Sequence, residues 1–314
     1  KKQAKIVAYR ENIPDRERIE TGQEGKKLGS AEMFAEVQRV LRQGQDVLIY
    51  VHGFNESWWK AVGTALALQA MLNRPSRWGA SGRNKNVLVV LFTWPSDGSA
   101  LPFAAYRSDR TEALGSGFAL GRGFLKLRDF LTETTRPPTT LEEKAGKKWD
   151  PCLQNVNILC HSMGNYVLQH ALQRLIEFSP KNRLPRIFDN IFLCSPDVDD
   201  NVLEPDQPLG RLHEMCCQIS LYYNNGDLAL RGSDITKGNP TRLGTNGTAD
   251  PSQIHPKIVQ IDCSNIVNGL MEHWYHLKGD INMDIRMSMD NVSQDSDTRV
   301  RERSIKNLNS YSMS

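Results

Sequence analysis

The sequence lacks the features that would assign it to several specialised classes. It contains no stretch of about 18 uninterrupted apolar residues, so no membrane-spanning helix is predicted. Its net charge is only +3 and the basic residues are scattered, which gives nucleic-acid binding little support. Internal repeats and domain linkers are absent too, and the chain has 39% hydrophobic and 24% charged residues. These features indicate one ordinary globular domain.

The six cysteines show no pattern of disulfide pairing. Cys216 and Cys217 are adjacent, a poor arrangement for an ordinary disulfide, whereas Cys160, Cys194 and Cys263 end apolar runs, where a thiol usually acts as a small buried hydrophobe. We interpret the cysteines as mostly reduced. The first residue is a lysine, which leaves open a removed targeting segment. We expect a cytoplasmic location, with secretion or anchoring as alternatives.

Short apolar runs recur along the chain and are separated by longer amphipathic stretches. They are rich in β-branched and aromatic residues without period-two alternation, which suits strands buried on both faces of a parallel sheet. Between them apolar residues recur at helical spacing, as over 33–41 (with Ser30 as cap and Gly44 as stop) and 167–175. This order predicts an α/β fold with a mostly parallel central sheet and helices on both faces. The runs are Ile6–Tyr9, Val47–Val51, Val87–Phe92, Val156–Cys160, Ile191–Cys194, Ile219–Tyr223 and Ile258–Ile261.

Two polar stretches are expected to lie outside the core. Residues 132–150 are rich in Thr, Pro, Lys and Glu and are predicted to form an exposed loop. Residues 286–314 are dominated by Ser, Asn, Asp and Arg, and we expect a polar C-terminal tail that adds little to the core. The domain would then span residues 1–285.

The most specific signal is NILCHSMGNYVLQHALQRL at 157–175, in which an apolar strand meets a helical pattern at Ser162. A serine on such a turn is held in strained backbone that projects its hydroxyl above the sheet, as a nucleophile requires. The turn needs small residues two positions either side. Gly164 satisfies this, while Cys160 replaces the usual glycine. Ser162 could merely cap the helix, but the order of strand, turn and helix favours a nucleophile.

A serine nucleophile needs a histidine to accept its proton and an acid to orient that histidine. In the topology that this turn suggests, the chain order is serine, acid, histidine. Asp227 follows a strand in an Asn-Asn-Gly loop, and His273 follows the last strand, with His276 as runner-up. Either histidine could instead be a surface or packed residue. Asp197 and Asp199 are second choices for the acid, interpreted as a structural turn or a supporting network.

The strand over 47–51 ends abruptly in His-Gly-Phe-Asn. Acyl transfer develops negative charge on a carbonyl oxygen, which preorganised backbone N–H groups stabilise. We expect the N–H groups of Phe54 and Met163 to form this oxyanion hole. Gly53 would make the turn that aims the Phe54 N–H. Five residues are predicted to shape the pocket: His52, Gly53, Asn55, Trp58 and His161. Trp58 and Trp59 would form an aromatic wall, unless one of them packs on the sheet.

These motifs carry a resemblance. The chain resembles the α/β-hydrolase superfamily, and within it a largely bacterial group of unknown function, over roughly residues 5–280. The resemblance implies a serine hydrolase acting on a small-molecule ester, with Ser162, Asp227 and His273 as triad and no cofactor or metal. It also implies that residues 96–130 form a partial lid. The motifs are His-Gly-Phe-Asn (52–55), Phe-Thr-Trp-Pro-Ser-Asp-Gly (92–98), His-Ser-Met-Gly-Asn (161–165) and Ser-Pro-Asp-Val-Asp (195–199), with Tyr-Arg-Ser-Asp (106–109) and Asp-Leu-Ala-Leu (227–230).

Several alternatives stay open at this point. A lipase, thioesterase, amidase or acyltransferase would share the nucleophile, and a catalytically silent hydrolase fold could bind a ligand or partner. A metal-dependent hydrolase using His273 and His276, or His213 with the cysteine pair, lacks a third ligand at a motif spacing. Glycines 115, 117, 121 and 123 do not follow a strand into a dinucleotide-binding motif. The sequence does not indicate an oligomeric state.

Overall fold

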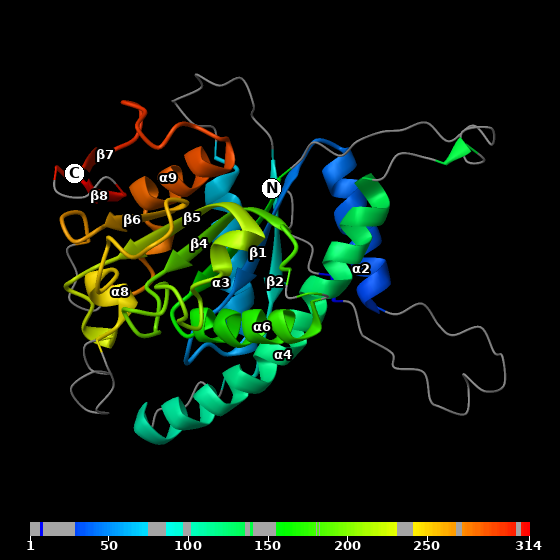
Figure 1. Ribbon diagram of the computed structural model, residues 1–314, viewed down its shortest axis with the longest axis horizontal. Coiled ribbons are helices and arrows are strands. Elements are labelled where there is room, and N and C mark those ends of the chain that lie inside the picture. The colour runs from blue at the N-terminus through cyan, green and yellow to red at the C-terminus, as the bar shows by residue number, and fades with distance from the viewer. Residues whose placement is uncertain are drawn as a thin grey trace.

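An eight-stranded sheet forms the centre of the computed structural model, in the strand order β2-β1-β3-β4-β5-β6-β8-β7 (Figure 1). The structure describes residues 7–8, 29–74, 86–96, 102–135, 139–140, 155–179, 181, 183–230, 241–267, 272–305 and 309–314. Neighbouring strands are parallel except for β7 and β8, which confirms the predicted mostly parallel sheet. The strands are β1 (Asp46–Val51), β2 (Val87–Phe92), β3 (Val156–His161), β4 (Phe188–Cys194), β5 (Cys216–Tyr223), β6 (Ile258–Asp262), β7 (Arg301–Arg303) and β8 (Ser310–Met313).

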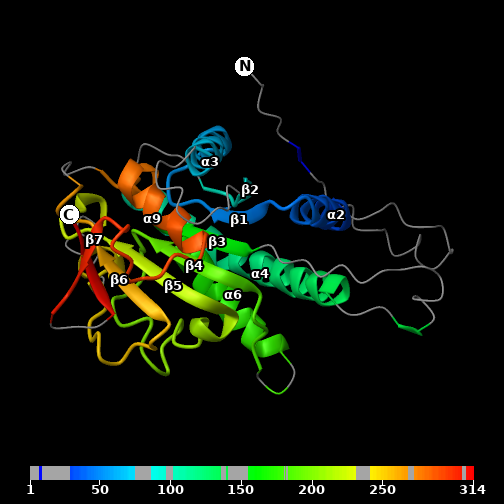
Figure 2. The same ribbon diagram turned by 90° about the horizontal axis from the view of Figure 1, so that it is seen from above.

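Helices cover both faces of the sheet (Figure 2). Each face has its own apolar core. One core is built by α2 (Gly29–Arg42), α4 (Pro102–Thr135) and α6 (Gly164–Phe178) against the sheet. The other is built by α3 (Trp58–Leu72) and α9 (Gly279–Met289). Short helical turns complete the described chain: η2 (Leu212–Met215), α8 (Leu243–Asn246) and η3 (Tyr275–Leu277).

Most of the predicted elements are present. Six of the apolar runs coincide with β1 to β6, and the helices predicted over 33–41 and 167–175 are α2 and α6. Gly44 has φ +81°, a left-handed conformation that suits a residue just past a helix end. The strand predicted at Ile6–Tyr9 is wrong where the structure describes it, because Val7 and Ala8 lie in no strand. Ile6 and Tyr9 lie outside the described residues.

Helix α4 accounts for the glycine-rich segment. A Cβ on Gly117 would lie 2.4 Å from the Cβ of His170, and one on Gly121 would lie 3.0 Å from the carbonyl oxygen of Ala171, both in α6. These glycines therefore allow two helices to approach closely, rather than forming a phosphate-binding turn. The same helix continues through residues 132–135, where a loop was predicted; residues 136–138 and 141–150 of that prediction lie outside the described part.

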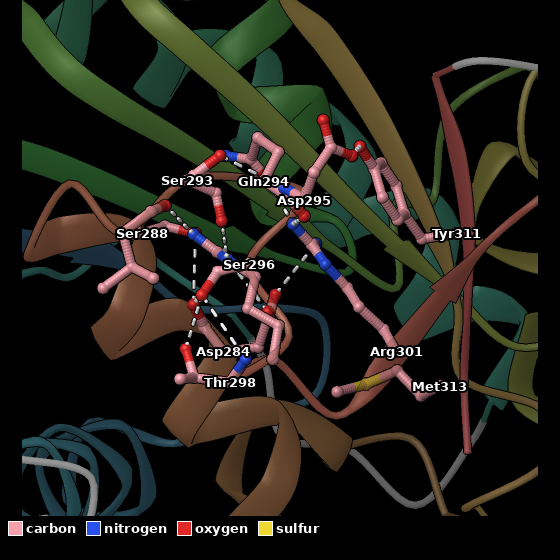
Figure 3. A network of polar contacts seen from close by, with 12 residues as sticks. Asp284, Ser288, Ser293, Gln294, Asp295, Ser296, Thr298, Arg301, Tyr311 and Met313 are labelled. Atoms are coloured by element: carbon pink, nitrogen blue, oxygen red, sulfur yellow. Dashed lines mark hydrogen bonds and ion pairs between the residues drawn. The ribbon is translucent and has the colours of Figure 1, made fainter. Parts of the chain in front are cut away.

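The prediction that residues 286–314 form a tail adding little to the core is wrong. Strand β8 pairs with β6, and Tyr311 and Met313 are buried. Polar contacts hold this segment in place (Figure 3): the buried carboxylate of Asp284 pairs with Arg299 at 2.7 Å and with Arg301 at 3.2 Å. Charged residues thus become core residues here because each has a partner, which apolar periodicity does not reveal.

The two edge strands of the sheet, β2 and β7, differ in sequence and charge. Strand β2 reads Val-Leu-Val-Val-Leu-Phe and lies at one end. Side chains at the end of α3 bond to its backbone: Asn73, just past the last helical residue, accepts from the Val87 N–H at 2.7 Å and donates to the Val87 carbonyl at 2.9 Å, while Gln69 accepts from the Val89 N–H at 2.8 Å. At the other end β7 is three residues long and reads Arg-Glu-Arg.

Because β1, β3, β4, β5 and β6 run parallel and in register, their carboxyl ends meet at one edge. Ligands of open α/β sheets bind at this edge. The His-Gly-Phe-Asn loop, Ser162, the loop with Asp197 and Asp227 each directly follow one of these strands.

Candidate active site

Ser162 sits on a tight, strained turn between β3 and α6. Its φ is 52°, a left-handed conformation that costs free energy for a residue other than glycine and is often kept at functional sites. Its N–H donates to the carbonyl of Cys194 at 2.9 Å, and its carbonyl accepts from the side-chain amide of Asn165 at 3.0 Å. The same amide group donates to the carbonyl of Cys160 at 3.0 Å. Asn165, fully buried, therefore braces both sides of the turn.

Two glycines make room for this turn. A Cβ on Gly164 would lie 2.6 Å from the carbonyl oxygen of Val51, and a Cβ on Gly53 would lie 2.8 Å from the Cβ of Ser162. Gly53 has no left-handed φ, and the turn in its loop is made by Asn55 at φ 57°. What the chain needs at Gly53 is close approach to Ser162 rather than backbone freedom.

The structure brings Asp227 and His273 together, 46 residues apart in sequence. His273 Nδ1 lies 2.7 Å from Asp227 Oδ2, and both residues are buried. The other oxygen, Oδ1, accepts the N–H groups of Ala229 at 3.1 Å and Leu230 at 3.3 Å. These donors fix the orientation of the carboxylate. Nδ1 of His273 is thus bonded to Asp227, and Nε2 has no hydrogen-bond partner in the described part of the chain.

The other acids at this edge have different partners. Asp197 accepts the Tyr106 hydroxyl at 2.9 Å and pairs with Arg242 at 3.2 Å, while Asp199 pairs with Arg242 at 2.6 Å. Asp197 also donates its N–H to the carbonyl of Ser162 at 3.2 Å. Both aspartates thus belong to a polar network beside the turn that carries Ser162.

Two backbone N–H groups next to Ser162 have no acceptor in the described part of the chain: those of Phe54 and Met163. A side chain of α4 holds the loop with Phe54 in place. Buried Asp109 accepts the N–H of Asn55 at 3.4 Å and the Ser96 hydroxyl at 2.5 Å. Both N–H groups are therefore without an acceptor in the described structure, the condition under which a backbone donor can bind an anionic oxygen.

Three histidine rings pack together next to the turn that carries Ser162. His161 lies 4.8 Å from His273 and 4.5 Å from His276, measured between ring centroids. Burial is the main cause that lowers the pKa of His161 well below its ordinary value, followed by the His276 and His273 charges. Burial likewise lowers the pKa of His276 to about 3. Both rings are therefore neutral at pH 7.

The residues predicted to shape the pocket fall into two groups. His52 and His161 are buried. The ring of His52 stacks on Trp94, and the backbone N–H of Trp94 donates to His52 Nε2 at 3.2 Å. Asn55 is exposed, as are Trp58 (43%) and Trp59 (74%), and the two tryptophan rings pack edge to face with centroids 4.5 Å apart.

Sequence reasoning assigned no role to Asn165, Asp109, Tyr106 or Ser195, although each stands in a motif of the resemblance. The motifs signalled that these positions matter, but nothing in the sequence indicates what each side chain bonds to. Their roles follow only from contacts between separate elements.

The described residues contain no group of three or more His, Cys, Asp or Glu placed to hold a metal ion. Cys160, Cys194, Cys216, Cys217 and Cys263 are free thiols, and Cys152 lies outside the described part. None of the described helices combines the length and apolar character that crossing a membrane requires.

Comparisons with known proteins agree with this architecture. The family described as "Alpha/beta hydrolase of unknown function" (DUF900) matches residues 30–133 and 147–276. An uncharacterized protein of Nostoc sp. is 26% identical over 182 residues, which are 49% of this chain and 41% of that protein. The chain thus spans less than half the length of this relative. Since the family match extends over more than half of the chain, the chain belongs to this family of α/β-hydrolases of unknown function.

Proposed function

We propose that this α/β-hydrolase cleaves carboxylic esters through an acyl-serine intermediate, with Ser162 as nucleophile, His273 as base and Asp227 as orienting acid. The observation that carries the proposal is the buried 2.7 Å contact between His273 Nδ1 and Asp227 Oδ2, at the same edge of the sheet as a serine held at φ 52°. This combination is costly to maintain and has no use in packing alone.

The mechanism has two steps. Ser162 Oγ attacks the ester carbonyl carbon while His273 Nε2 takes the hydroxyl proton, and Asp227 stabilises the resulting imidazolium. The N–H groups of Phe54 and Met163 stabilise the oxyanion. His273 then gives its proton to the departing alcohol, and a water molecule, activated by the same histidine, hydrolyses the acyl-enzyme.

A lipase, thioesterase or amidase would use the same groups and differ in the pocket and leaving group. A catalytically silent fold that binds a ligand would have no need for a free Nε2 on a histidine oriented by a buried carboxylate. The arrangement of Asp227 and His273 therefore favours an enzyme. The partial lid over residues 96–130 stays a prediction; its described part is Ser96 and residues 102–130 of α4.

Turnover of p-nitrophenyl esters with acyl chains from two to sixteen carbons tests the proposal, with wild type beside Ser162→Ala. We expect activity on part of the series and loss of nearly all of it in the variant, whose melting temperature should stay unchanged. Labelling with a fluorophosphonate probe, followed by peptide mapping, should modify Ser162. A folded wild-type protein that neither turns over any ester nor reacts with the probe would favour the ligand-binding alternative.

A further inference from the structure

The carbonyl oxygen of His273 accepts two hydrogen bonds from side chains of other elements. His161 Nε2 lies 3.1 Å from this oxygen, and Ser195 Oγ lies 3.0 Å from it. His161 ends β3 and Ser195 directly follows β4, so both donors stand at the ends of adjacent strands. In the described part of the chain these are the only hydrogen bonds to the His273 backbone.

The segment of His273 is held by side-chain contacts of its neighbours: Trp274 Nε1 donates to Glu56 at 2.7 Å and the Tyr275 hydroxyl to the carbonyl of Tyr222 at 3.0 Å. Residues 272–274 belong to no helix or strand, and residues 268–271 lie outside the described part. A general base must keep its ring within hydrogen-bond reach of the proton that it takes. Asp227 fixes one ring nitrogen of His273, and the two bonds to the carbonyl oxygen hold the backbone of the same residue.

The contact with the His273 carbonyl fixes the tautomer of the first donor, His161. A carbonyl oxygen only accepts, so His161 must carry its proton on Nε2. The ring is buried and packs against His273 and His276, which leaves it no alternative orientation without loss of this packing. His161 also precedes Ser162 directly, so this bond ties the turn with the nucleophile to the segment with the base.

The second donor is held in strained backbone. Ser195 has φ 47° and is fully buried, yet it is neither glycine nor asparagine, the residues that tolerate this conformation best. Its N–H donates to the carbonyl of Tyr222 at 3.1 Å, as the N–H of Ser162 donates to that of Cys194 at 2.9 Å. The two serines thus end neighbouring strands in the same left-handed conformation. One presents the nucleophile, and the other directs its hydroxyl at His273.

We propose that His161 and Ser195 are positioning residues that clamp the carbonyl of His273 and so hold the catalytic base in reach of Ser162. This inference rests on the proposed function and adds to it two residues that act through His273. Because the clamp acts on the geometry of proton transfer, its loss should lower kcat and leave KM nearly unchanged.

Ser195→Ala and Ser195→Gly test the second donor, since both remove the hydroxyl and only glycine relieves the strain at φ 47°. Both should lose kcat by a similar factor, about 10-fold or more, although the glycine variant should be at least as stable as the alanine variant. Ser220→Ala is the matched control: Ser220 is also buried, and its hydroxyl has no partner among the described residues. It should leave kcat unchanged. Equal kcat in Ser195→Ala and Ser220→Ala would overturn the clamp.

His161→Gln and His161→Leu test the first donor. The Gln side chain can place an N–H near the position of Nε2, whereas Leu cannot, so Gln should retain more kcat than Leu at equal KM. Equal losses in two folded variants would show that His161 only packs, which contradicts the clamp.

A measurement that does not need turnover separates the clamp from the proposed function. The His273 Nδ1–H that bonds to Asp227 should give a low-field proton resonance in the wild type, identified by its loss in His273→Ala. We expect that resonance to shift or broaden in Ser195→Ala and to stay in place in Ser220→Ala. An unchanged resonance in Ser195→Ala would overturn the clamp even if no ester is turned over, whereas absent turnover with a shifted resonance would count against the proposed function alone.

Discussion

At the scale of single residues, the surroundings of two aspartates separate the orienting acid from its competitor. Asp227 is buried, bonds to His273 and accepts two backbone N–H groups. The Asp199 side chain is 46% exposed and pairs with Arg242. We predict that Asp227→Asn lowers kcat by about 10⁴-fold and that Asp199→Asn leaves it little changed. Steady-state kinetics of the two variants would check this, and a larger loss in Asp199→Asn would show that the acid is assigned wrongly.

The same scale shows what a sequence can indicate about this site. Ser162, Asp227 and His273 stand out because their order along the chain and their places after strands follow from chemistry that many sequences share. Ser195 does not stand out, because its role depends on a backbone angle and on a carbonyl 78 residues away. Contacts of side chains with distant backbone leave no local pattern.

At the scale of elements, the glycines of α4 allow a matched comparison. Gly117 faces α6, where an added methyl group would overlap His170, while Gly115 has nothing within 4 Å of its Cβ position. We predict that Gly117→Ala costs about 1–3 kcal/mol of unfolding free energy, and that Gly115→Ala adds roughly 0.5–1 kcal/mol because alanine favours a helix. Urea denaturation measures both. Stabilisation by both substitutions would mean that α4 does not pack on α6 in this register.

The ion pairs of the C-terminal segment give a second matched pair. Arg299 and Asp284 are buried together, whereas Arg303 and Asp295 form an exposed pair. Arg299→Met leaves the Asp284 carboxylate without one of its cations and should cost about 3–5 kcal/mol. Arg303→Met should cause no measurable change, since exposed pairs contribute little. Denaturation midpoints compare the two, and equal midpoints would contradict the burial of the Arg299 pair.

These pairs also explain where prediction of the fold from sequence succeeded and failed. Runs such as Val47–Val51 are apolar throughout, so their burial follows from composition. Arg301 and Tyr311 lie in polar sequence, and they are buried because Asp284 and the neighbouring strands supply partners. Such partners become known only once the chain has folded.

At the scale of the whole molecule, buried neutral histidines make stability depend on pH. His276 has a pKa of about 3 in the folded protein against an ordinary 6.5. Between these values the unfolded chain binds a proton that the folded chain does not, so stability falls as the pH drops from about 6.5 toward 3. The slope from this residue is at most about 1.4 kcal/mol per pH unit.

His276→Phe removes this titratable ring and should flatten the pH dependence of stability. The phenyl ring breaks no side-chain hydrogen bond there, because neither ring nitrogen of His276 has a partner among the described residues. Urea denaturation at pH 8 and pH 5 would show a smaller difference between the two values for the variant than for the wild type. An identical difference in both proteins would mean that His276 is protonated in the folded state.

The ends of the sheet have a consequence for the behaviour of the protein at high concentration. An apolar edge strand with free peptide groups is a template on which another chain can add a strand and begin to aggregate. On β2 the side chains of Gln69 and Asn73 already occupy the outward N–H groups of Val87 and Val89. On β7 the edge is too short and too charged to extend. The side-chain amides of Gln69 and Asn73 thus leave an added strand fewer free N–H groups on this apolar edge.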